Sequence, residues 1–416
     1  MSATVIHGEG LSGRLPELDG LRGLAIGMVL LCHFFFIFIQ ARPGSPGAYL
    51  LTVGRLTWSG VDLFFVLSGF LIGGILLDAR SSSNYFRVFY TRRFFRIVPI
   101  YAVLLLVSYF FTFLWQAHIL RGFNEIFAGH LPWLPFALFL QNFELALRNS
   151  WGIFPLGVTW SLAVEEQFYL TLPLLIRFLN RRALLAVIFS GIAFAPVLRT
   201  FFLSLSPPRF LAWYTLMPCR ADALLLGVLG ALALRDPRCR AFLLSHRRLL
   251  TLSLSFLLCG VAFLAWRSPS IHDPLMVTAG FTWLALFYLA VLLYSLLFSS
   301  SWIARCLRWG WLGGLGAIAY GAYLFHQLFL SLFFGRLPWI SSWRHFVLAV
   351  ITLAFTLVFC RLSWLYFEKP LVALGHRSRY HFADSAGHIL QAKESSPQVV
   401  SSTFAPPDVP TLRRSS

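Results

Sequence analysis

The chain has little charge for its size. Only 12% of its 416 residues are Asp, Glu, Lys or Arg, whereas 58% are hydrophobic and 17% are aromatic. Soluble domains carry about 25% charged residues, so this composition cannot cover a surface that faces water. The shortage of charge excludes a soluble multidomain enzyme and a disordered chain, and it indicates an all-α, polytopic transmembrane bundle.

Acidic residues are the scarcest charged group. The 16 Asp and Glu residues stand against 34 Lys and Arg residues, and the formal net charge is +18. In a soluble chain this balance would suggest nucleic-acid binding. In a membrane protein, basic residues instead gather at the cytoplasmic ends of the spans. We therefore expect no nucleic-acid partner and attribute most of the charge to membrane topology.

Several chemical signatures are missing as well. The six cysteines lie far apart and form no C-x-x-C pair, which argues against a structural disulfide or a zinc site. The sequence has no G-x-S-x-G, P-loop or H-E-x-x-H motif and no G-x-G-x-x-G after a strand, so it lacks the usual hydrolase, nucleotide and zinc signatures. We expect no metal and no resident cofactor. The glycines within 311–316 are predicted to permit close helix packing.

What the chain does contain is a series of apolar runs of about 20 residues, the length that spans a bilayer. We predict ten spans, at about residues 23–40, 60–79, 97–116, 158–177, 183–203, 216–234, 249–267, 275–298, 312–335 and 345–366. The segment 131–143 is apolar but short and carries two prolines. We expect a re-entrant or interfacial piece there instead of an eleventh span.

The basic residues follow these predicted spans. When the loops are numbered alternately, 24 of the 34 Lys and Arg residues fall on the side of the N-terminus. The positive-inside rule then places both termini in the cytoplasm. We expect a cytoplasmic N-terminus without a cleavable signal at 1–14, the membrane domain at 15–372, and a disordered polar cytoplasmic tail at 373–416.

A few ionisable residues fall inside the predicted spans, where they are costly and usually functional or paired. Arg22 and His33 are eleven residues apart, close to three helical turns, so they lie on one face about 16 Å apart. Asp19 could pair with Arg22 across one turn. His326 also falls near the middle of the membrane. His33 could equally be a core residue that bonds a neighbouring helix, and for His326 this structural interpretation is the stronger of the two.

Four carboxylates complete this set. Asp62 and Asp222 lie near the outer ends of their spans, where a salt bridge or a cap is as good an interpretation as chemistry. Glu165 and Glu166 are adjacent and point about 100° apart, so at most one faces a given site. Two carboxylates at this depth need partners, and Arg220 or another inward Arg could supply one.

Arg92, Arg93 and Arg96 stand together at the cytoplasmic entrance of the third predicted span. Arg binds phosphate groups in a bidentate manner, so a nucleotide-bearing substrate from the cytosol could dock there. Contact with anionic lipid headgroups, or membrane topology alone, would explain the run equally well.

Seven ordered blocks of the sequence resemble the membrane-bound acyltransferase-3 family, whose members are integral membrane O-acyltransferases. The resemblance covers about residues 15–372. It rests on LPELDGLRGLAIGMVLLCHF (15–34), GVDLFFVLSGFLIGGIL (60–76), YTRRFFRIVPIY (90–101), TWSLAVEEQFYLTLPLL (159–175), CRADALLLGVLGAL (219–232), AYGAYLFHQ (319–327) and YFEKPL (366–371).

The resemblance implies roles for several residues. The family's Arg-x10-His motif falls on Arg22 and His33, and it makes His33 the catalytic base. The family's other charged blocks fall on Arg92, Arg93 and Arg96, on Glu165 and Glu166, and on His326. Many relatives carry a C-terminal hydrolase-like domain outside the cytoplasm, and this chain resembles the stand-alone members.

Together, the residues and the resemblance predict a multi-pass transferase of the inner (plasma) membrane. It would move an acyl group, in the first instance acetyl, from acyl-CoA to a hydroxyl of a carbohydrate or small molecule, with His33 accepting the hydroxyl proton. Direct transfer and a covalent relay both remain open. The predicted catalytic residues are His33, Arg22, Glu165 and Glu166, and the predicted substrate-binding residues are Arg92, Arg93, Arg96, Asp62, Asp222 and His326.

A proton-coupled transporter, or a flippase of a lipid-linked intermediate, is the alternative. Intramembrane His and Glu residues suit proton relays as well as acyl transfer. A transporter predicts discontinuous helices at paired positions in two halves of the chain. The sequence shows no such pairing, which favours the enzyme.

Overall fold

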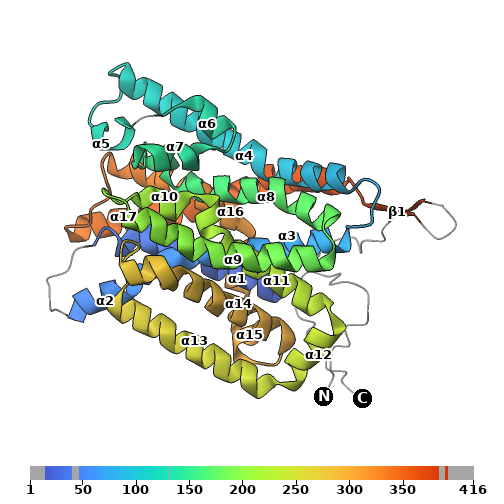
Figure 1. The fold of residues 1–416 in the computed structure, drawn as a ribbon. Helices are drawn as coiled ribbons and strands as arrows, with labels where there is room; N and C mark the ends of the chain where they lie inside the picture. Colours follow the sequence, from blue (N-terminus) through green and yellow to red (C-terminus); the bar gives the residue numbers. More distant parts are fainter. Residues whose placement is uncertain (1–14, 40–45, 130, 384–388, 392–416) are drawn as a thin grey trace, which may run out of the picture.

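The computed structural model describes residues 15–39, 46–129, 131–383 and 389–391. The predicted all-α class is confirmed, because the long elements in this part of the chain are helices (Figure 1). They are α1 (Pro16–Leu31), α3 (Gly60–Asp78), α4 (Tyr85–Gln116), α8 (Trp160–Phe178), α9 (Arg181–Ser204), α11 (Met217–Arg235), α13 (Arg247–Arg267), α14 (Phe281–Leu297), α16 (Gly310–Phe334) and α17 (Trp343–Ser363).

Shorter elements connect or extend these helices. The short α-helices are α2 (Pro46–Arg55), α5 (Asn124–Phe127), α6 (Trp133–Ala137), α7 (Gln141–Arg148), α10 (Phe210–Thr215), α12 (Pro237–Ser245), α15 (Trp302–Leu307) and α18 (Lys369–His376). Two 3-10 helices, η2 (Leu56–Ser59) and η3 (Phe154–Thr159), precede α3 and α8. Three π-helices interrupt the long helices at η1 (Cys32–Phe36), η4 (Met276–Gly280) and η5 (Trp364–Glu368). One antiparallel hairpin pairs β1 (His381–Ala383) with β2 (Ile389–Gln391).

The predicted spans match the long helices closely. Within the described residues, nine helical segments are long and apolar enough to cross a membrane. The tenth predicted span is α8, which is long enough but carries Glu165, Glu166 and Arg177. Neither α6 nor α7 could cross a bilayer, as expected for residues 131–143.

Two helices begin earlier than hydropathy predicts. The first starts at Pro16 instead of residue 23, with proline at its first turn and Glu17 and Asp19 beside it. Both features favour a helix N-terminus, since proline needs no N–H partner there and acidic groups complement the helix dipole. The helix α4 starts at Tyr85 instead of residue 97. In both cases a polar extension continues the helix beyond the apolar part, so hydropathy alone misses it.

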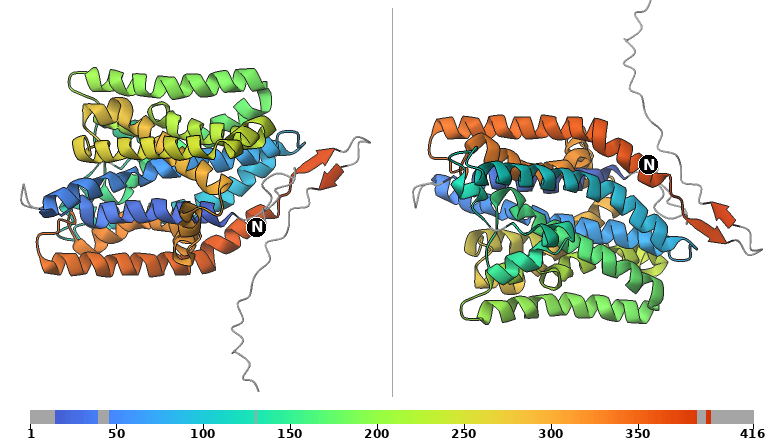
Figure 2. Two further views of the ribbon diagram at one scale, coloured as in Figure 1. Left: turned by 90° about the horizontal axis from the view of Figure 1, so that it is seen from below. Right: turned by 90° about the horizontal axis from the view of Figure 1, so that it is seen from above.

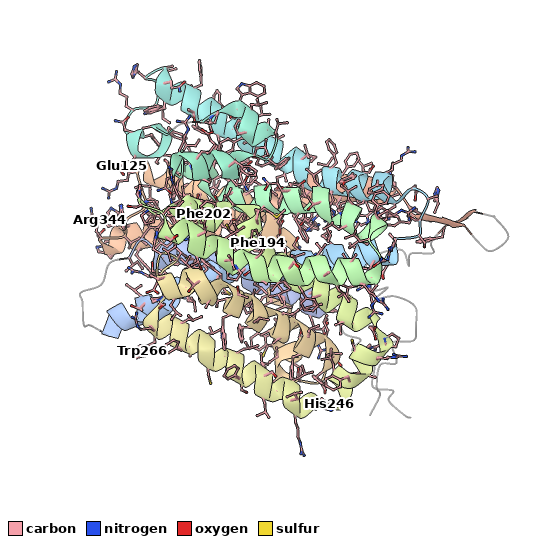
Figure 3. The ribbon with its side chains drawn as sticks, in the orientation of Figure 1. Glu125, Phe194, Phe202, His246, Trp266 and Arg344 are labelled. Atoms are coloured by element: carbon pink, nitrogen blue, oxygen red, sulfur yellow. The ribbon has the colours of Figure 1, made fainter. Side chains whose placement is uncertain are left out.

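The long helices form a bundle with a buried centre and an apolar periphery. Most of α3, α11 and α16 is buried, whereas only a small share of α9, α13 and α17 is buried inside the bundle. Figure 2 shows α9 and α17 at opposite edges of the bundle. Phe194 and Phe202 project from α9 in Figure 3, and Phe194 is more than half exposed. The periphery thus has the composition of a lipid-facing surface.

Close backbone contact joins α1 to α16. A Cβ atom on Gly23 would lie 2.0 Å from the carbonyl oxygen of Leu312, and one on Gly316 would lie 2.0 Å from the carbonyl oxygen of Asp19. The predicted packing role of the 311–316 glycines therefore holds for Gly316. The glycines at 313–314 have nothing within 4 Å of the same position. The two helices can approach this closely only because both contact positions lack a side chain.

The basic loops meet at one end of the bundle. Arg235 donates two hydrogen bonds to Asp78, at 2.7 and 2.5 Å, which ties α11 to α3. Arg181 pairs with Asp236 at the same end. The elements α12, α15 and β1 lie at this end in Figure 1. The positive-inside rule predicts that this end faces the cytoplasm.

The last described part of the chain follows α17 through η5 into α18 and the β-hairpin. The predicted N-terminal segment 1–14 lies outside the described residues. So do residues 384–388 and 392–416 of the predicted tail. All six cysteines lie in the described part and carry free thiols.

Candidate active site

A cavity of about 310 Å³ lies among α1, α3, α4, α8 and α16. Its mouth, at the arginine-rich end of the bundle, is lined by Arg22, Arg93, Arg96 and His376. Its walls are mostly apolar, with Glu165 and Tyr169 from α8 among the polar exceptions. Toward the middle of the bundle it is lined by Val61, Phe64, Ser161 and Tyr323. The cavity thus leads from a cationic entrance into an apolar interior.

Three guanidinium groups gather at this mouth. Arg22 donates a 3.2 Å hydrogen bond to Asp19, as its spacing predicts, and the charges of Arg93 and Arg96 act on Arg22 at short range. The Nε atom of Arg93 is buried and has no hydrogen-bond partner in the described structure. Like charges at close range repel, so the cluster favours an anion that can accept hydrogen bonds from several of them.

The side chain of Arg92 does not point into the cavity, unlike those of Arg93 and Arg96. Its Nε and Nη2 atoms both donate to the carbonyl oxygen of Ser378, at 3.1 and 2.8 Å. Its guanidinium also lies 5.2 Å from the centre of the Tyr380 ring. Of the three arginines in the predicted run, Arg93 and Arg96 therefore line the cavity, whereas Arg92 contacts the segment after α18.

The two adjacent glutamates divide as their 100° separation predicts. Glu165 lines the cavity and accepts a 3.3 Å hydrogen bond from the Tyr169 hydroxyl, which lies 2.6 Å from the Ser68 hydroxyl. Glu166 is not part of the lining, and its Oε1 atom is buried without a partner in the described structure. The charge of Arg93 acts on both glutamates.

The sequence left two candidates as partners for these glutamates, Arg220 and another inward arginine. Arg220 pairs with Asp62, so Arg220 is not their counterion. Arg93 is the other inward arginine, because it lines the cavity together with Glu165 and its charge acts on both glutamates. Sequence spacing could not distinguish the two arginines, since neither lies on the helix that carries the glutamates.

Glu368 is a buried carboxylate that the residue-by-residue reasoning missed. It lies in η5, is only 5% exposed, and accepts a 3.1 Å hydrogen bond from the Ser363 hydroxyl. A Cβ atom on Gly321 would lie 2.9 Å from its Oε1 atom, which places the carboxylate directly against α16. The charge of Arg96 acts on it. Its only sequence signal was its place in the YFEKPL block.

His33 and His326 come together deep in the bundle. Their ring centroids lie 4.9 Å apart at an interplanar angle of 57°. The Nδ1 atom of His33 lies 3.0 Å from the Val29 carbonyl oxygen, and that of His326 lies 2.7 Å from the Tyr323 carbonyl oxygen. A carbonyl oxygen can only accept, so each Nδ1 carries the proton and each Nε2 keeps its lone pair.

These backbone bonds also settle what orients the rings. Both carbonyl partners belong to the histidine's own helix, three or four residues earlier. Among the described contacts, neither Glu165 nor Glu166 bonds an imidazole. His33 lies in the π-helix η1, and π-turns within α-helices are frequent at functional sites.

Tyr323 separates the cavity from the histidine pair. Its ring lies at the inner end of the cavity, and its centroid is 5.9 Å from that of His326. Its hydroxyl donates to the Val158 carbonyl oxygen at 2.9 Å and lies 2.6 Å from the Ser161 hydroxyl. His326 is fully buried and its Nε2 has no partner in the described structure, whereas His33 is partly exposed.

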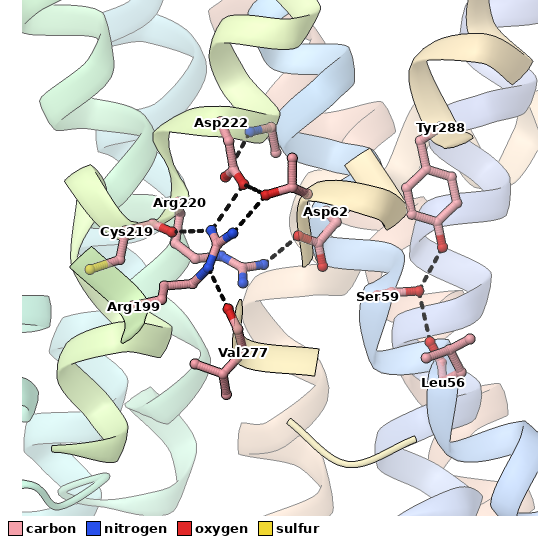
Figure 4. Close-up of polar contacts among 11 residues, drawn as sticks. Leu56, Ser59, Asp62, Arg199, Cys219, Arg220, Asp222, Val277 and Tyr288 are labelled. Atoms are coloured by element: carbon pink, nitrogen blue, oxygen red, sulfur yellow. Dashed lines mark hydrogen bonds and ion pairs between the residues drawn. The ribbon is translucent and has the colours of Figure 1, made fainter. Parts of the chain in front are cut away.

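Asp62 and Asp222 lie in two neighbouring buried ion pairs (Figure 4). Asp222 accepts a 2.9 Å hydrogen bond from Arg199, which also donates to the carbonyl oxygens of Val277 and Cys219. Asp62 pairs with Arg220, as noted above. Both carboxylates therefore form salt bridges, which was one of the two interpretations offered by the sequence. Neither side chain lines the cavity, so the other interpretation, a chemical role there, has no support from the cavity lining.

Metal binding has no candidate in the described residues. They contain no group of three or more His, Cys, Asp or Glu side chains placed to hold an ion.

The chain belongs to the acyltransferase-3 family, because the family profile described as "Acyltransferase domain" matches residues 15–365. This confirms the resemblance seen in the sequence blocks. The match covers every helix that lines the cavity except α18.

Curated relatives carry names that refer to O-acetyl transfer. The chain is 29% identical over 376 residues to "Putative peptidoglycan O-acetyltransferase YrhL" of Bacillus subtilis, covering 88% of this chain and 56% of that protein. It is 27% identical over 372 residues to "Peptidoglycan O-acetyltransferase OatA" of Listeria monocytogenes, covering 86% and 56%. The chain thus spans little more than half the length of these relatives. No solved structure matches it.

Proposed function

We propose that this protein is an integral membrane O-acyltransferase that moves an acetyl group from acetyl-CoA to a hydroxyl of a carbohydrate. One observation carries the proposal. A single cavity runs from a cluster of three arginines at the arginine-rich end of the bundle to Tyr323, whose ring lies 5.9 Å from that of His326, and His326 in turn lies against His33. The names of the two relatives, which refer to peptidoglycan O-acetyl transfer, support acetyl as the acyl group and a glycan as the acceptor.

Arg22, Arg93 and Arg96 would bind the acetyl donor. The phosphates of CoA would accept hydrogen bonds from these guanidinium groups, which suit planar, bidentate contacts. The charges of Glu165, Glu166 and Glu368 offset part of the positive charge of Arg93 and Arg96. The pantetheine arm would then run down the apolar walls of the cavity, with its thioester toward Tyr323 and the histidines.

The chemical step falls to the histidine pair. The acceptor oxygen attacks the thioester carbon while Nε2 of His33 takes the hydroxyl proton, and the carbon–sulfur bond breaks. The proton on Nε2 then passes to the departing sulfur, so the products are an acetyl ester and CoA thiol. We assign the proton transfer to His33 because it is the partly exposed member of the pair, and His326 lies against it as a second acceptor.

The test is an assay on the full chain in detergent or liposomes. Radiolabelled acetyl-CoA is supplied with peptidoglycan fragments and other cell-envelope glycans, and alkali-labile label on the glycan is measured. The proposal expects labelled ester that disappears in His33→Ala. Absence of ester with every acceptor, together with uptake of an unmodified solute into the liposomes, would overturn it in favour of the transporter.

A further inference from the structure

The mouth of the cavity includes a residue from outside the region that matches the family profile. The profile ends at residue 365, whereas His376, the last residue of α18, lines the cavity beside Arg22, Arg93 and Arg96. The residues from α18 to β1 (369–383) are called the C-terminal strap here. They reach the mouth after α17 has crossed back through the bundle.

The strap is held against the start of α4 by bonds to its backbone. Asn84 donates to the Arg379 carbonyl oxygen at 2.9 Å, and its own side-chain oxygen accepts from the His381 N–H at 3.0 Å. Arg92 donates twice to the Ser378 carbonyl oxygen, as described above. Both side chains therefore fix the path of the strap just beyond His376.

The helix α18 also lies in direct contact with α4. A Cβ atom on Gly375 would lie 3.1 Å from the Cβ atom of Phe95, which is closer than an ordinary contact, so the two helices pack tightly at this position. Gly375 is the neighbour of His376, and Phe95 is the neighbour of Arg96. The close contact thus sets the imidazole of His376 at the height of the arginine cluster.

We propose that His376 is a binding residue for the phosphates of the donor, and that Arg92 is a positioning residue that acts through the strap. The proposal rests on the proposed function, because it takes the donor to be acyl-CoA. CoA bears a diphosphate and a 3′-phosphate, whereas one of the three cavity arginines, Arg22, is already paired with Asp19. An imidazole at the rim adds an N–H donor, and a positive charge when protonated, where a phosphate would enter.

The first experiment compares two donors. In His376→Ala the KM for acetyl-CoA should rise about tenfold, the loss expected for one charge-assisted hydrogen bond, with kcat nearly unchanged. With acetylpantetheine, which lacks the nucleotide phosphates, the same variant should match the wild type. His376→Arg should restore the KM for acetyl-CoA. Arg377→Ala, at the exposed next residue outside the cavity lining, is the matched control and should change neither value.

The second experiment separates the position of Arg92 from a direct phosphate contact. Arg92→Lys cannot donate twice to one carbonyl oxygen from a planar group, so it should raise the KM for acetyl-CoA in the same direction as His376→Ala. The double variant should then be no worse than His376→Ala alone, because Arg92 acts through His376. Additive effects would instead make Arg92 a phosphate ligand in its own right and overturn its positioning role.

The outcomes distinguish this inference from the proposed function. If the wild type transfers acetyl from acetyl-CoA but His376→Ala leaves the KM unchanged, the inference about His376 is wrong and the proposed function stands. If His376→Ala lowers the kcat for acetyl-CoA and acetylpantetheine equally, the strap has only a structural role. If the wild type uses no CoA donor at all, the proposed function itself fails.

Discussion

The imidazole rings of His33 and His326 lie 4.9 Å apart, and each donates its Nδ1–H to a carbonyl oxygen of its own helix. The two Nε2 atoms are therefore the proton acceptors of the pair. Two imidazolium ions at this distance would repel each other, so the pair takes up only one proton beyond the two on its Nδ1 atoms. An acid–base centre of this kind can take a proton from an incoming hydroxyl without a carboxylate partner.

Replacement of His33 with Ala should abolish transfer. We expect a loss of at least about 100-fold in kcat, because a positioned general base contributes that much or more to proton transfer. The protein should still insert and purify, since the His33 side chain bonds only its own helix in the described structure. Ester formation and the circular dichroism of the purified variant provide the two measurements. Near-normal activity would contradict the assignment of His33 as the base.

His326 can be tested with two variants, Asn and Ala, of which only Asn keeps a hydrogen-bond donor in place of Nδ1. In His326→Asn the amide can still donate to the Tyr323 carbonyl oxygen, but nothing replaces Nε2. We expect His326→Asn to lose as much activity as His326→Ala. It should nevertheless unfold at a higher temperature than His326→Ala, because it keeps one hydrogen bond that contributes about 1 kcal/mol to the free energy of unfolding. If His326→Asn keeps its activity, Nε2 of His326 takes no part in the chemistry.

The arginines of the cavity mouth should affect donor binding more than turnover. Arg93→Gln and Arg96→Gln should each raise the KM for acetyl-CoA about tenfold or more, because each removes a charged donor to phosphate. Arg87→Gln removes an equal charge from the same helix at a position that does not line the cavity. Equal effects at all three positions would show that general surface charge, and not the cavity, attracts the donor.

The contact between α1 and α16 predicts unequal effects of two glycine substitutions on one helix. Gly23→Ala should destabilise the protein by about 1–3 kcal/mol, because its methyl group would overlap the Leu312 carbonyl oxygen. Gly27→Ala, where nothing lies within 4 Å, should be neutral or slightly stabilising. Thermal unfolding in one detergent compares them. A neutral Gly23→Ala would mean that the two helices can separate without cost.

Breaking the buried ion pair of Asp62 and Arg220 should cost far more stability than breaking an exposed pair. Asp62→Asn leaves a buried guanidinium without its counterion and should cost about 3–5 kcal/mol. Asp78→Asn, which breaks the partly exposed pair with Arg235, should cost about 0–1 kcal/mol. The double variant Asp62→Asn/Arg220→Gln should recover part of the loss, and failure to do so would show that Arg220 needs no counterion.

The fold could be predicted from the sequence largely because a bilayer allows few structures. Apolar runs of about 20 residues have to be helices, since no water is present to satisfy the backbone. The starts of α1 and α4 could not be predicted in this way, because their polar first turns lie beyond the apolar part. Hydropathy locates a span, and only capping and charge locate the end of the helix.

The candidate site could be predicted in part, and its limits have a physical cause. The spacing of Arg22 and His33 predicts that both lie on one face of a single helix, and the structure places Arg22 at the cavity and His33 beside His326. Arg92 and Arg93 lie within about 60° of Arg96 around the helix axis, so spacing could not tell which of them faces the cavity. The neighbours of α4 decide that, through the carbonyl of Ser378. The pairing of His33 with His326 likewise depends on which helices pack together.

The close contact of α1 with α16 has a consequence for how the protein is made. The helix that carries His33 enters the membrane early in synthesis, yet its partner helix follows only after most of the chain has been translated. Until then Gly23 faces no neighbour, and His33 has no second imidazole beside it. A chain truncated before residue 326 would insert into the membrane with His33 but without His326 beside it. The histidine pair is therefore assembled late, when α17 is the only long helix of the described residues that remains to be made.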